Sequence, residues 1–217
     1  MNRTAIKELL SWKISEGRKP LIVKGVRQSG KTYLLKEFGR QAYEDVAYFN
    51  FEGNESLQKC FEGDLEPQRI VTELGVFRHQ VIHPEKTLII FDEIQFCNRA
   101  LTSLKYFFEN APAYHVVCAG SLLGISLSRP LSFPVGKVDF LALRPLSFYE
   151  FVAANGGQEL LEHLSGLKRG ERVPELFTGI MIDHLKNYYI IGGMPEAVKK
   201  WVDTKDVVEV ENIQQKI

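Results

Sequence analysis

The most constraining feature of the sequence is the octapeptide "GVRQSGKT" at residues 25–32. Gly25, Gly30, Lys31 and Thr32 match the pattern G-x-x-x-x-G-K-[ST], in which glycines let the backbone turn tightly and present its amides to phosphate oxygens. In this pattern Lys31 reaches the β- and γ-phosphates and the Thr32 hydroxyl binds Mg²⁺. An apolar run at residues 20–26 precedes the loop, and a helical pattern at residues 31–42 follows it. The sequence therefore predicts a nucleotide-binding loop between a strand and a helix.

The remaining residues of the loop carry weaker signals. We include Gln28, Ser29 and Tyr33 in the predicted nucleotide-binding set because they lie inside the loop or directly after it. Arg27 and Gln28 either contact phosphate or only fill positions where the pattern does not require glycine.

A second feature, "TLIIFDEIQ", begins at residue 87 and contains two adjacent carboxylates. Asp92 is expected at the carboxyl end of an apolar strand, the edge where α/β sheets bind ligands, and is predicted to hold Mg²⁺ directly or through water. Glu93 is predicted to be the catalytic residue that orients and deprotonates an attacking water, as hydrolysis requires. The alternative is that both residues form an ordinary acidic strand end.

Another apolar run, "HVVCAGS", ends at Ser121. In sheets of this kind such a strand lies between the phosphate-loop strand and the strand that ends in Asp92. The Ser121 hydroxyl is then expected near the γ-phosphate, where it helps to position the water during catalysis. The alternative is that Gly120 and Ser121 only form the turn that follows the strand.

The order of elements along the chain predicts an α/β fold. β-rich runs alternate with helical stretches, and their near-continuous apolar character is typical of parallel strands covered on both faces. Helical spacing also places Leu101, Leu104, Phe107 and Phe108 on one face of a helix that ends before Pro112. Repetition of strand, helix and strand implies right-handed crossovers. The β-rich runs are residues 20–26, 46–52, 87–94, 115–121 and 138–143.

The strand pattern stops before the last third of the chain. Ser147 and Glu150 have the spacing of a capping box, a pair of glycines follows, and apolar residues then recur at helical spacing. We therefore predict a core domain at residues 1–146 and a helical domain at residues 147–217. The sequence ends inside an apparent helix, which favours a protein that continues beyond residue 217, although a frayed natural end is the alternative.

Composition and charge argue against several classes of function. Lysine plus arginine and aspartate plus glutamate both number 27, so no net charge favours nucleic acid or an anionic membrane. The three cysteines lack metal-site spacing and leave an odd count for pairing, which favours a reduced, intracellular setting. The N-terminus lacks the apolar region of a signal peptide, and the least charged run, residues 116–128, is too short to span a bilayer. A cytoplasmic protein without a membrane segment is expected.

Five motifs in order give the chain a family resemblance: "GVRQSGKT", "LIIFDEIQ", "AGSLLG", "SFPVGKVDFLALRPLSFYEF" and "IIGGMPEAV". The sequence resembles the archaeal-type ATP-binding proteins of the AAA-like P-loop ATPase superfamily over nearly its whole length. The resemblance implies a P-loop NTPase (RecA/AAA-like) three-layer core with a parallel sheet of order 5-1-4-3-2, a small helical or winged-helix lid, and ATP as the nucleotide. It also implies the roles given above for Lys31, Thr32, Asp92 and Glu93, with Ser121 as the sensor. Most full-length members carry a further nuclease-like C-terminal domain, and nothing in this sequence resembles it.

One departure from the family concerns the arginine finger that neutralises charge in the transition state. The stretch before the fifth strand often reads Gly-Arg in the family, but it reads Gly136–Lys137 here. Lysine is a poorer substitute because it lacks the planar fork of arginine. Arg129 and Arg144 are the other candidates, and each also reads as an ordinary surface residue. A finger supplied in trans would require a neighbouring copy, which leaves the oligomeric state open.

Two functions remain open on the sequence alone. The first is an ATPase that hydrolyses Mg²⁺-ATP to ADP and phosphate and couples hydrolysis to a conformational change. The second is a nucleotide-gated interaction module that holds a protein partner with negligible turnover. A kinase is less favoured because Lys168, Arg169 and Arg172 form the only basic cluster, and a GTPase is less favoured because the base-reading Asn/Thr-Lys-x-Asp motif is absent. Trp12 either covers the adenine base or packs in the core.

Overall fold

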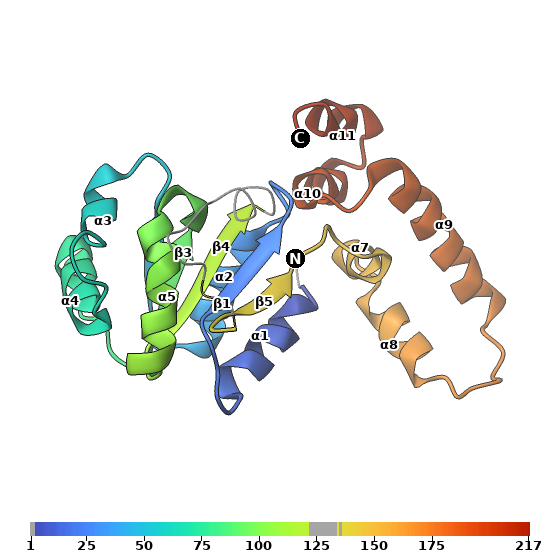
Figure 1. Cartoon of the computed structure of the whole chain (residues 1–217). Coiled ribbons are helices and arrows are strands. Elements are labelled where there is room, and N and C mark those ends of the chain that lie inside the picture. The colour runs from blue at the N-terminus through green and yellow to red at the C-terminus, as the bar shows by residue number, and fades with distance from the viewer. Residues whose placement is uncertain (1–2, 122–133, 135) are drawn as a thin grey trace. The chain divides into compact units, whose positions relative to one another are not determined.

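The computed structural model describes residues 3–121, 134 and 136–217. The chain divides into two compact units. The larger unit comprises Ala5–Arg27 and Lys31–Leu143, and the smaller unit comprises Met1–Thr4, Gln28–Gly30 and Arg144–Ile217. Figure 1 shows the strands in the larger unit and the helices from α7 to α11 in the smaller one.

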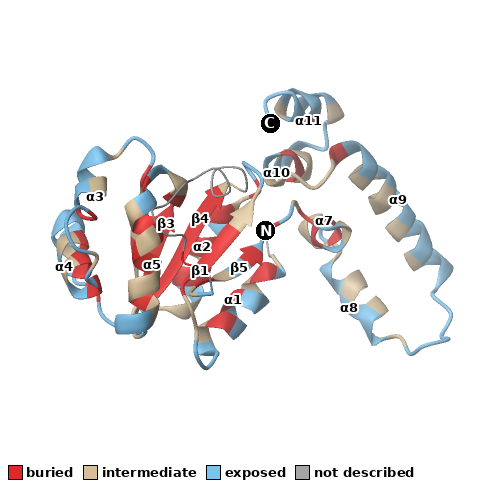
Figure 2. Cartoon of the chain, in the orientation of Figure 1, coloured by how far each residue is buried: buried red, intermediate tan, exposed pale blue. Residues whose placement is uncertain are grey.

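A five-stranded sheet forms the centre of the larger unit. Its order is β2-β3-β4-β1-β5 and every neighbouring pair is parallel, which confirms the predicted fold and strand order. β3 is buried along its whole length and β4 along all but its last residue (Figure 2), as expected for parallel strands covered on both faces. The strands are β1 (Leu21–Gly25), β2 (Asp45–Asn50), β3 (Thr87–Asp92), β4 (His115–Ser121) and β5 (Asp139–Ala142).

Two of the strands end earlier than their apolar runs predict. β2 ends at Asn50 and β3 ends at Asp92, although the runs continue to residues 52 and 94. Glu93 has left-handed backbone angles, φ 51° and ψ 44°, so the extended conformation cannot continue through it. The chain turns there into a short 3₁₀ helix, η1 (Ile94–Phe96).

Helices cover the sheet on both faces and produce three layers. One apolar cluster joins alternate strand residues to α4 (Pro67–Arg78) and α5 (Asn98–Asn110), and a second joins the intervening strand residues to α1 (Ala5–Ile14) and α2 (Lys31–Ala42). Alternation of strand residues between the two clusters follows from the two-residue period of a strand. α3 (Glu55–Lys59) contributes Leu57 to the first cluster.

The predicted helical face of α5 is largely confirmed. Leu101, Leu104 and Phe107 are buried, whereas Phe108 at the edge of this face is only half-buried. The helix ends at Asn110, two residues before Pro112.

The smaller unit contains helices and no strand within residues 144–217, all of which are described. Its core combines Leu146 with residues of four helices, including Phe151, Ile191, Val198 and Val210. Ser147 and Glu150 form the capping box that their spacing predicts. The helices are α7 (Phe148–Ala154), α8 (Gln158–Gly166), α9 (Glu175–Ile191), α10 (Pro195–Thr204) and α11 (Val207–Gln214). Among the described residues of both units, no helix has the length and apolar character needed to cross a membrane.

Candidate functional site

The loop that follows β1 turns through two residues with left-handed backbone angles. Gln28 has φ 60° and Gly30 has φ 88°. Glycine adopts this conformation at little cost, whereas Gln28 is held there against its preference. Ser29, between them, is fully buried, while the side chain of Tyr33 in the first turn of α2 is 55% exposed. The loop is therefore a fixed turn between a central strand and a helix, with Gly25 as the last residue of the strand.

Lys31 begins α2 and folds back over the loop. Its ammonium nitrogen donates to the carbonyl oxygens of Gly25 at 3.1 Å and Val26 at 2.8 Å, and only 6% of the residue is exposed. Burial lowers the pKa of Lys31, and the negative charges of Glu93 and Asp92 oppose this shift. The positive charge therefore lies inside the loop, close to both predicted acidic residues.

The carboxylate of Asp92 connects the loop helix to the sheet. Thr32 Oγ1 donates to Asp92 Oδ2 at 2.7 Å, and the hydroxyl of Tyr48 donates to the same oxygen at 2.7 Å. The backbone amide of Glu93 donates to the other oxygen at 3.1 Å. Asp92 is only 3% exposed, and a buried carboxylate requires such partners. The structure thus brings Thr32 and Asp92 together, although they are 60 positions apart in the sequence.

Tyr48 is a site residue that the sequence did not indicate. It lies on β2 next to β3, and its contact with Asp92 depends on the pairing of these two strands. Burial raises the pKa of its hydroxyl above the ordinary value, and the hydrogen bond to Asp92 raises it further. The ammonium of Lys36 lies 3.7 Å from the centre of the Tyr48 ring, which packs this ring against α2. The only sequence signal was a hydroxyl inside a β-rich run.

Glu93 is held by a second residue that the sequence did not indicate. The side-chain amide nitrogen of Gln95 donates to Glu93 Oε2. The other end of the same amide, Gln95 Oε1, is buried and has no hydrogen-bond partner among the described residues. A hydrogen bond to a charged group contributes about 1.5–3 kcal/mol, and a buried acceptor without a partner costs about 1–3 kcal/mol. The Gln95 side chain therefore keeps its hydrogen bond to Glu93 although its own amide oxygen is buried without a partner among the described residues.

Ser121 occupies the strand position that the sequence predicts. It is the last residue of β4, which lies between β1 and β3, and it is paired across the sheet with Gly25. The end of β4 thus adjoins the start of the phosphate loop. A role for its hydroxyl in catalysis stays a prediction.

The candidates for an arginine finger differ in their positions. Lys137 forms an ion pair with Glu109 at 3.0 Å and lies 5.4 Å from the ring centre of Phe108, near the C-terminus of α5. It precedes β5, so it lies at the amino end of the sheet, about 15 Å from the loop at the carboxyl end of β1. Lys137 therefore does not reach the loop of its own chain.

The other two candidates remain without an assigned role. Arg144 has an exposed side chain, and its carbonyl oxygen accepts a hydrogen bond from Arg3. Arg129 lies outside the described residues. Arg3 also donates to the carbonyl oxygen of Ser29 at 3.3 Å and forms an ion pair with Glu150 at 3.3 Å, so this N-terminal residue bonds to the loop.

Trp12 packs in the core and does not line the loop. Its indole nitrogen donates to the carbonyl oxygen of Lys19 at 2.8 Å, and its ring meets the edge of Phe38. The residue is 7% exposed. The packing alternative for Trp12 is therefore the correct one.

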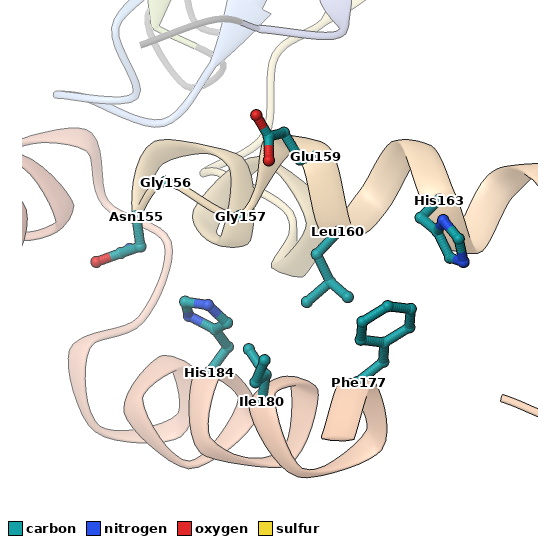
Figure 3. A pocket seen from close by; sticks show the side chains of 9 residues that line it. All are labelled: Asn155, Gly156, Gly157, Glu159, Leu160, His163, Phe177, Ile180 and His184. Atoms are coloured by element: carbon teal, nitrogen blue, oxygen red, sulfur yellow. The ribbon is translucent and has the colours of Figure 1, made fainter. Parts of the chain in front are cut away.

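Two further cavities are lined entirely by described residues. The first, of about 440 Å³, lies between α8 and α9, and Figure 3 shows Phe177, Ile180 and His184 of α9 extending toward Leu160 of α8. The rings of His163 and Phe177 meet edge-on at 5.0 Å. The second, of about 590 Å³, is lined by Lys13, Arg18, Glu85 and His115, among others, at the amino end of β4. Neither brings together a nucleophile, a base and a group that orients it, so the loop after β1 is the candidate site.

The groups at this site fit magnesium and a nucleotide phosphate. Thr32 and Asp92 offer a hydroxyl and a carboxylate oxygen, which are the ligands that Mg²⁺ prefers. Among the described residues, no group of three or more histidine, cysteine, aspartate or glutamate side chains forms a metal cluster. A magnesium ion held by few protein ligands and by substrate phosphates requires no such cluster.

Comparisons with known proteins agree with this geometry. Residues 17–152, more than half of the chain, match the family described as AAA domain. The chain belongs to the AAA domain family. Its fold indicates nucleotide binding and confirms the resemblance to AAA-like P-loop ATPases. A search of curated protein sequences found no match.

Solved structures show the same fold as this AAA domain at low sequence identity. AMPPCP-bound DnaA from Aquifex aeolicus is 15% identical, with a TM-score of 0.50, and the match covers 98% of this chain and 63% of the DnaA chain. Drosophila ORC bound to DNA is also 15% identical, with a TM-score of 0.53, and the match covers 98% of this chain and 66% of the ORC chain. The chain thus spans just under two thirds of the length of either structure, and the likeness concerns the fold.

Proposed function

We propose that this AAA domain binds ATP with Mg²⁺, hydrolyses it to ADP and phosphate, and couples hydrolysis to a conformational change. The observation that carries the proposal is the 2.7 Å contact between the Thr32 hydroxyl and the Asp92 carboxylate. Lys31, which precedes Thr32 on α2, supplies a buried cation, and Glu93, which follows the end of β3, supplies a second carboxylate. Phosphate binding, metal binding and base catalysis thereby have groups at adjoining positions.

Each group has a task in this reaction. Gly25, Gln28, Ser29, Gly30 and Tyr33 line the nucleotide, and Lys31 contacts the β- and γ-phosphates. Thr32 and Asp92 would hold Mg²⁺, which would supply positive charge to neutralise the phosphate oxygens.

Glu93 takes a proton from water, the water oxygen forms a bond to the γ-phosphorus, and the bond to the ADP oxygen breaks. Ser121 positions this water from the end of β4. The proton leaves Glu93 for solvent after phosphate departs, which restores the carboxylate for the next turnover.

A nucleotide-gated interaction module with negligible turnover is the second candidate. Lys137 supports it, because the contact of this residue with Glu109 keeps one of the three finger candidates away from the loop of its own chain. Under either function we propose that residues 1–146 form the ATPase core and residues 147–217 a helical lid that responds to the nucleotide.

We further propose that the partners, apart from ATP and ADP, are proteins or second copies of the chain. The DNA in the ORC structure is not carried over, because that likeness concerns the fold and the charges of this chain balance. We propose a cytoplasmic location, which the three free, buried cysteines support.

The test compares phosphate release and nucleotide binding in the wild type, Glu93→Gln and Lys31→Ala, with exposed Lys7→Ala as the charge-matched control. We expect Glu93→Gln to bind ATP normally and to lose at least about 100-fold in kcat, because general base catalysis contributes about 10²–10⁴-fold. We expect Lys31→Ala to lose binding, Lys7→Ala to match the wild type, and EDTA to abolish release. Normal ATP binding with background phosphate release in the wild type would establish the gated module instead.

A further inference from the structure

The turn that follows Glu93 is held rigidly at both ends. Ile94 is fully buried and Cys97 is 6% exposed, and both pack in the apolar cluster beneath α4 and α5. The amide of Phe96 donates to the carbonyl of Glu93 at 3.0 Å, and the amide of Cys97 donates to the carbonyl of Ile94 at 3.0 Å. Gln95 lies between these anchors, so its backbone has a defined position relative to Glu93.

The side chain of Gln95 is turned toward the Glu93 carboxylate and not toward water. Its amide nitrogen donates to Glu93 Oε2, while its amide oxygen is buried without a partner among the described residues. A glutamine without a task would satisfy both ends of its amide by turning outward. The left-handed backbone conformation of Glu93 is a second unfavourable feature of this turn, and such conformations cluster at functional sites.

We propose that Gln95 is a positioning residue that holds the Glu93 carboxylate in the orientation that receives the proton of the attacking water. This inference rests on the proposed hydrolysis of ATP and adds a residue to that site. The free oxygen of Glu93 accepts the proton while the oxygen bonded to Gln95 fixes the plane of the carboxylate. Displacement of a catalytic group by about 1 Å can reduce a rate about 100-fold, so such a contact has a measurable effect.

The test uses two substitutions of the full chain. Gln95→Met keeps the length of the side chain and removes both polar atoms, including the buried oxygen without a partner. Gln95→Glu keeps the shape and replaces the donor with a charge that repels Glu93. We expect kcat to fall about 10-fold in Gln95→Met and about 100-fold in Gln95→Glu, with KM for ATP and nucleotide affinity unchanged.

Gln41→Met is the matched control. Gln41 also donates its amide to a glutamate, Glu37, but this pair lies on the exposed surface of α2, about 15 Å from the loop end of the helix. We expect its kcat to equal that of the wild type.

A double substitution separates positioning from a structural role. If Gln95 acts through Glu93, then Gln95→Met causes no further loss of single-turnover rate when Glu93 is already Gln. An equal kcat in Gln95→Met and the wild type, or a full additional loss in the double variant, would overturn the inference and leave ATP hydrolysis standing. A wild type that releases no phosphate would overturn both.

Discussion

At the scale of single residues, the Asp92 carboxylate accepts three hydrogen bonds at the site. Hydroxyls from α2 and from β2 donate to one of its oxygens, and a backbone amide donates to the other. A magnesium ligand must keep a fixed orientation, and residues that bond to metal ligands commonly provide it. If Asp92 holds Mg²⁺ as proposed, Tyr48 would provide this orientation when Thr32 turns toward the metal.

Tyr48→Phe is expected to lower the free energy of unfolding by about 1–2 kcal/mol. A hydrogen bond to a charged group contributes about 1.5–3 kcal/mol, and Asp92 retains two other donors after the substitution. Urea denaturation without nucleotide measures the change. Tyr33→Phe is the control, because that side chain is mostly exposed and is expected to leave stability unchanged. Equal stability of Tyr48→Phe and the wild type would show that the bond to Asp92 contributes nothing.

The residues that could be predicted from the sequence are those with local signals. Lys31 and Thr32 belong to a continuous pattern, and Asp92 and Glu93 end an apolar run, so each could be assigned without tertiary structure. Tyr48 could not, since its contact requires strand pairing. Gln95 could not either, because its approach to Glu93 depends on a left-handed turn, which glutamate rarely adopts.

At the scale of elements, the segment before α7 and the segment between α9 and α10 contact each other in the smaller unit. The amide of Leu146, before α7, donates to the carbonyl of Gly193, between α9 and α10, at 2.6 Å. A Cβ added to Gly193 would lie 2.2 Å from the carbonyl oxygen of Leu146. Only glycine therefore permits this close approach of two backbone segments.

Gly193→Ala is expected to lower the stability of the smaller unit by about 2 kcal/mol or more, because a backbone carbonyl cannot move aside as a flexible side chain does. Gly179→Ala provides the opposite case. Gly179 lies inside α9 with nothing within 4 Å of an added Cβ, so alanine is expected to raise stability by about 0.5–1 kcal/mol through helix propensity. Thermal unfolding followed by far-ultraviolet circular dichroism measures both. A Gly193→Ala variant as stable as the wild type would contradict this account.

Helices and strands with a clear pattern of apolar residues could be predicted from the sequence, whereas the ends of some of them could not. The runs that became β1, β4 and β5 match the strands within a residue, and α5 ends close to its predicted limit before Pro112. The ends of β2 and β3 were misplaced because apolar residues continue past each strand into the core. Phe51 and Ile94 are fully buried there although they are no longer part of the sheet.

At the scale of the whole molecule, His115 is a buried titratable residue between the layers, at the amino end of β4. Its Nδ1 lies 2.7 Å from the hydroxyl of Tyr43, and its ring meets Trp12 of α1 edge-on. Lys13, Arg18 and Glu85 are the charged groups that line the adjoining cavity. Burial lowers the pKa of His115 to about 4, and the positive charges of Arg18 and Lys13 act in the same direction.

This shift predicts a loss of stability in mild acid. His115 has a depressed pKa in the folded state, so its contribution is complete above the unfolded value of 6.5 and is lost as the pH falls toward about 4. Between pH 7 and pH 5 the loss from this residue is about 2 kcal/mol. His115→Asn, which keeps a side-chain acceptor near Tyr43, is expected to reduce the pH dependence by that amount.

Fluorescence of Trp12 in a Trp201→Phe background measures unfolding of the larger unit alone, because Trp201 belongs to the smaller one. His163→Asn, a substitution in the smaller unit, is the control. An unchanged pH dependence in His115→Asn would show that other groups govern stability in acid.

The centre of the sheet depends on strands that are synthesised late. β1 lies between β4 and β5, yet β1 ends at residue 25 and these neighbours begin at residues 115 and 139. On the ribosome, the phosphate loop is made early, but β1 has no neighbouring strand until β4 has emerged, and β5 completes the sheet only at Ala142. Pairing over such a separation is slow, because the entropy of a long loop is lost before any strand contact forms. We therefore expect a nascent chain to acquire affinity for nucleotide only after β4 has paired with β1.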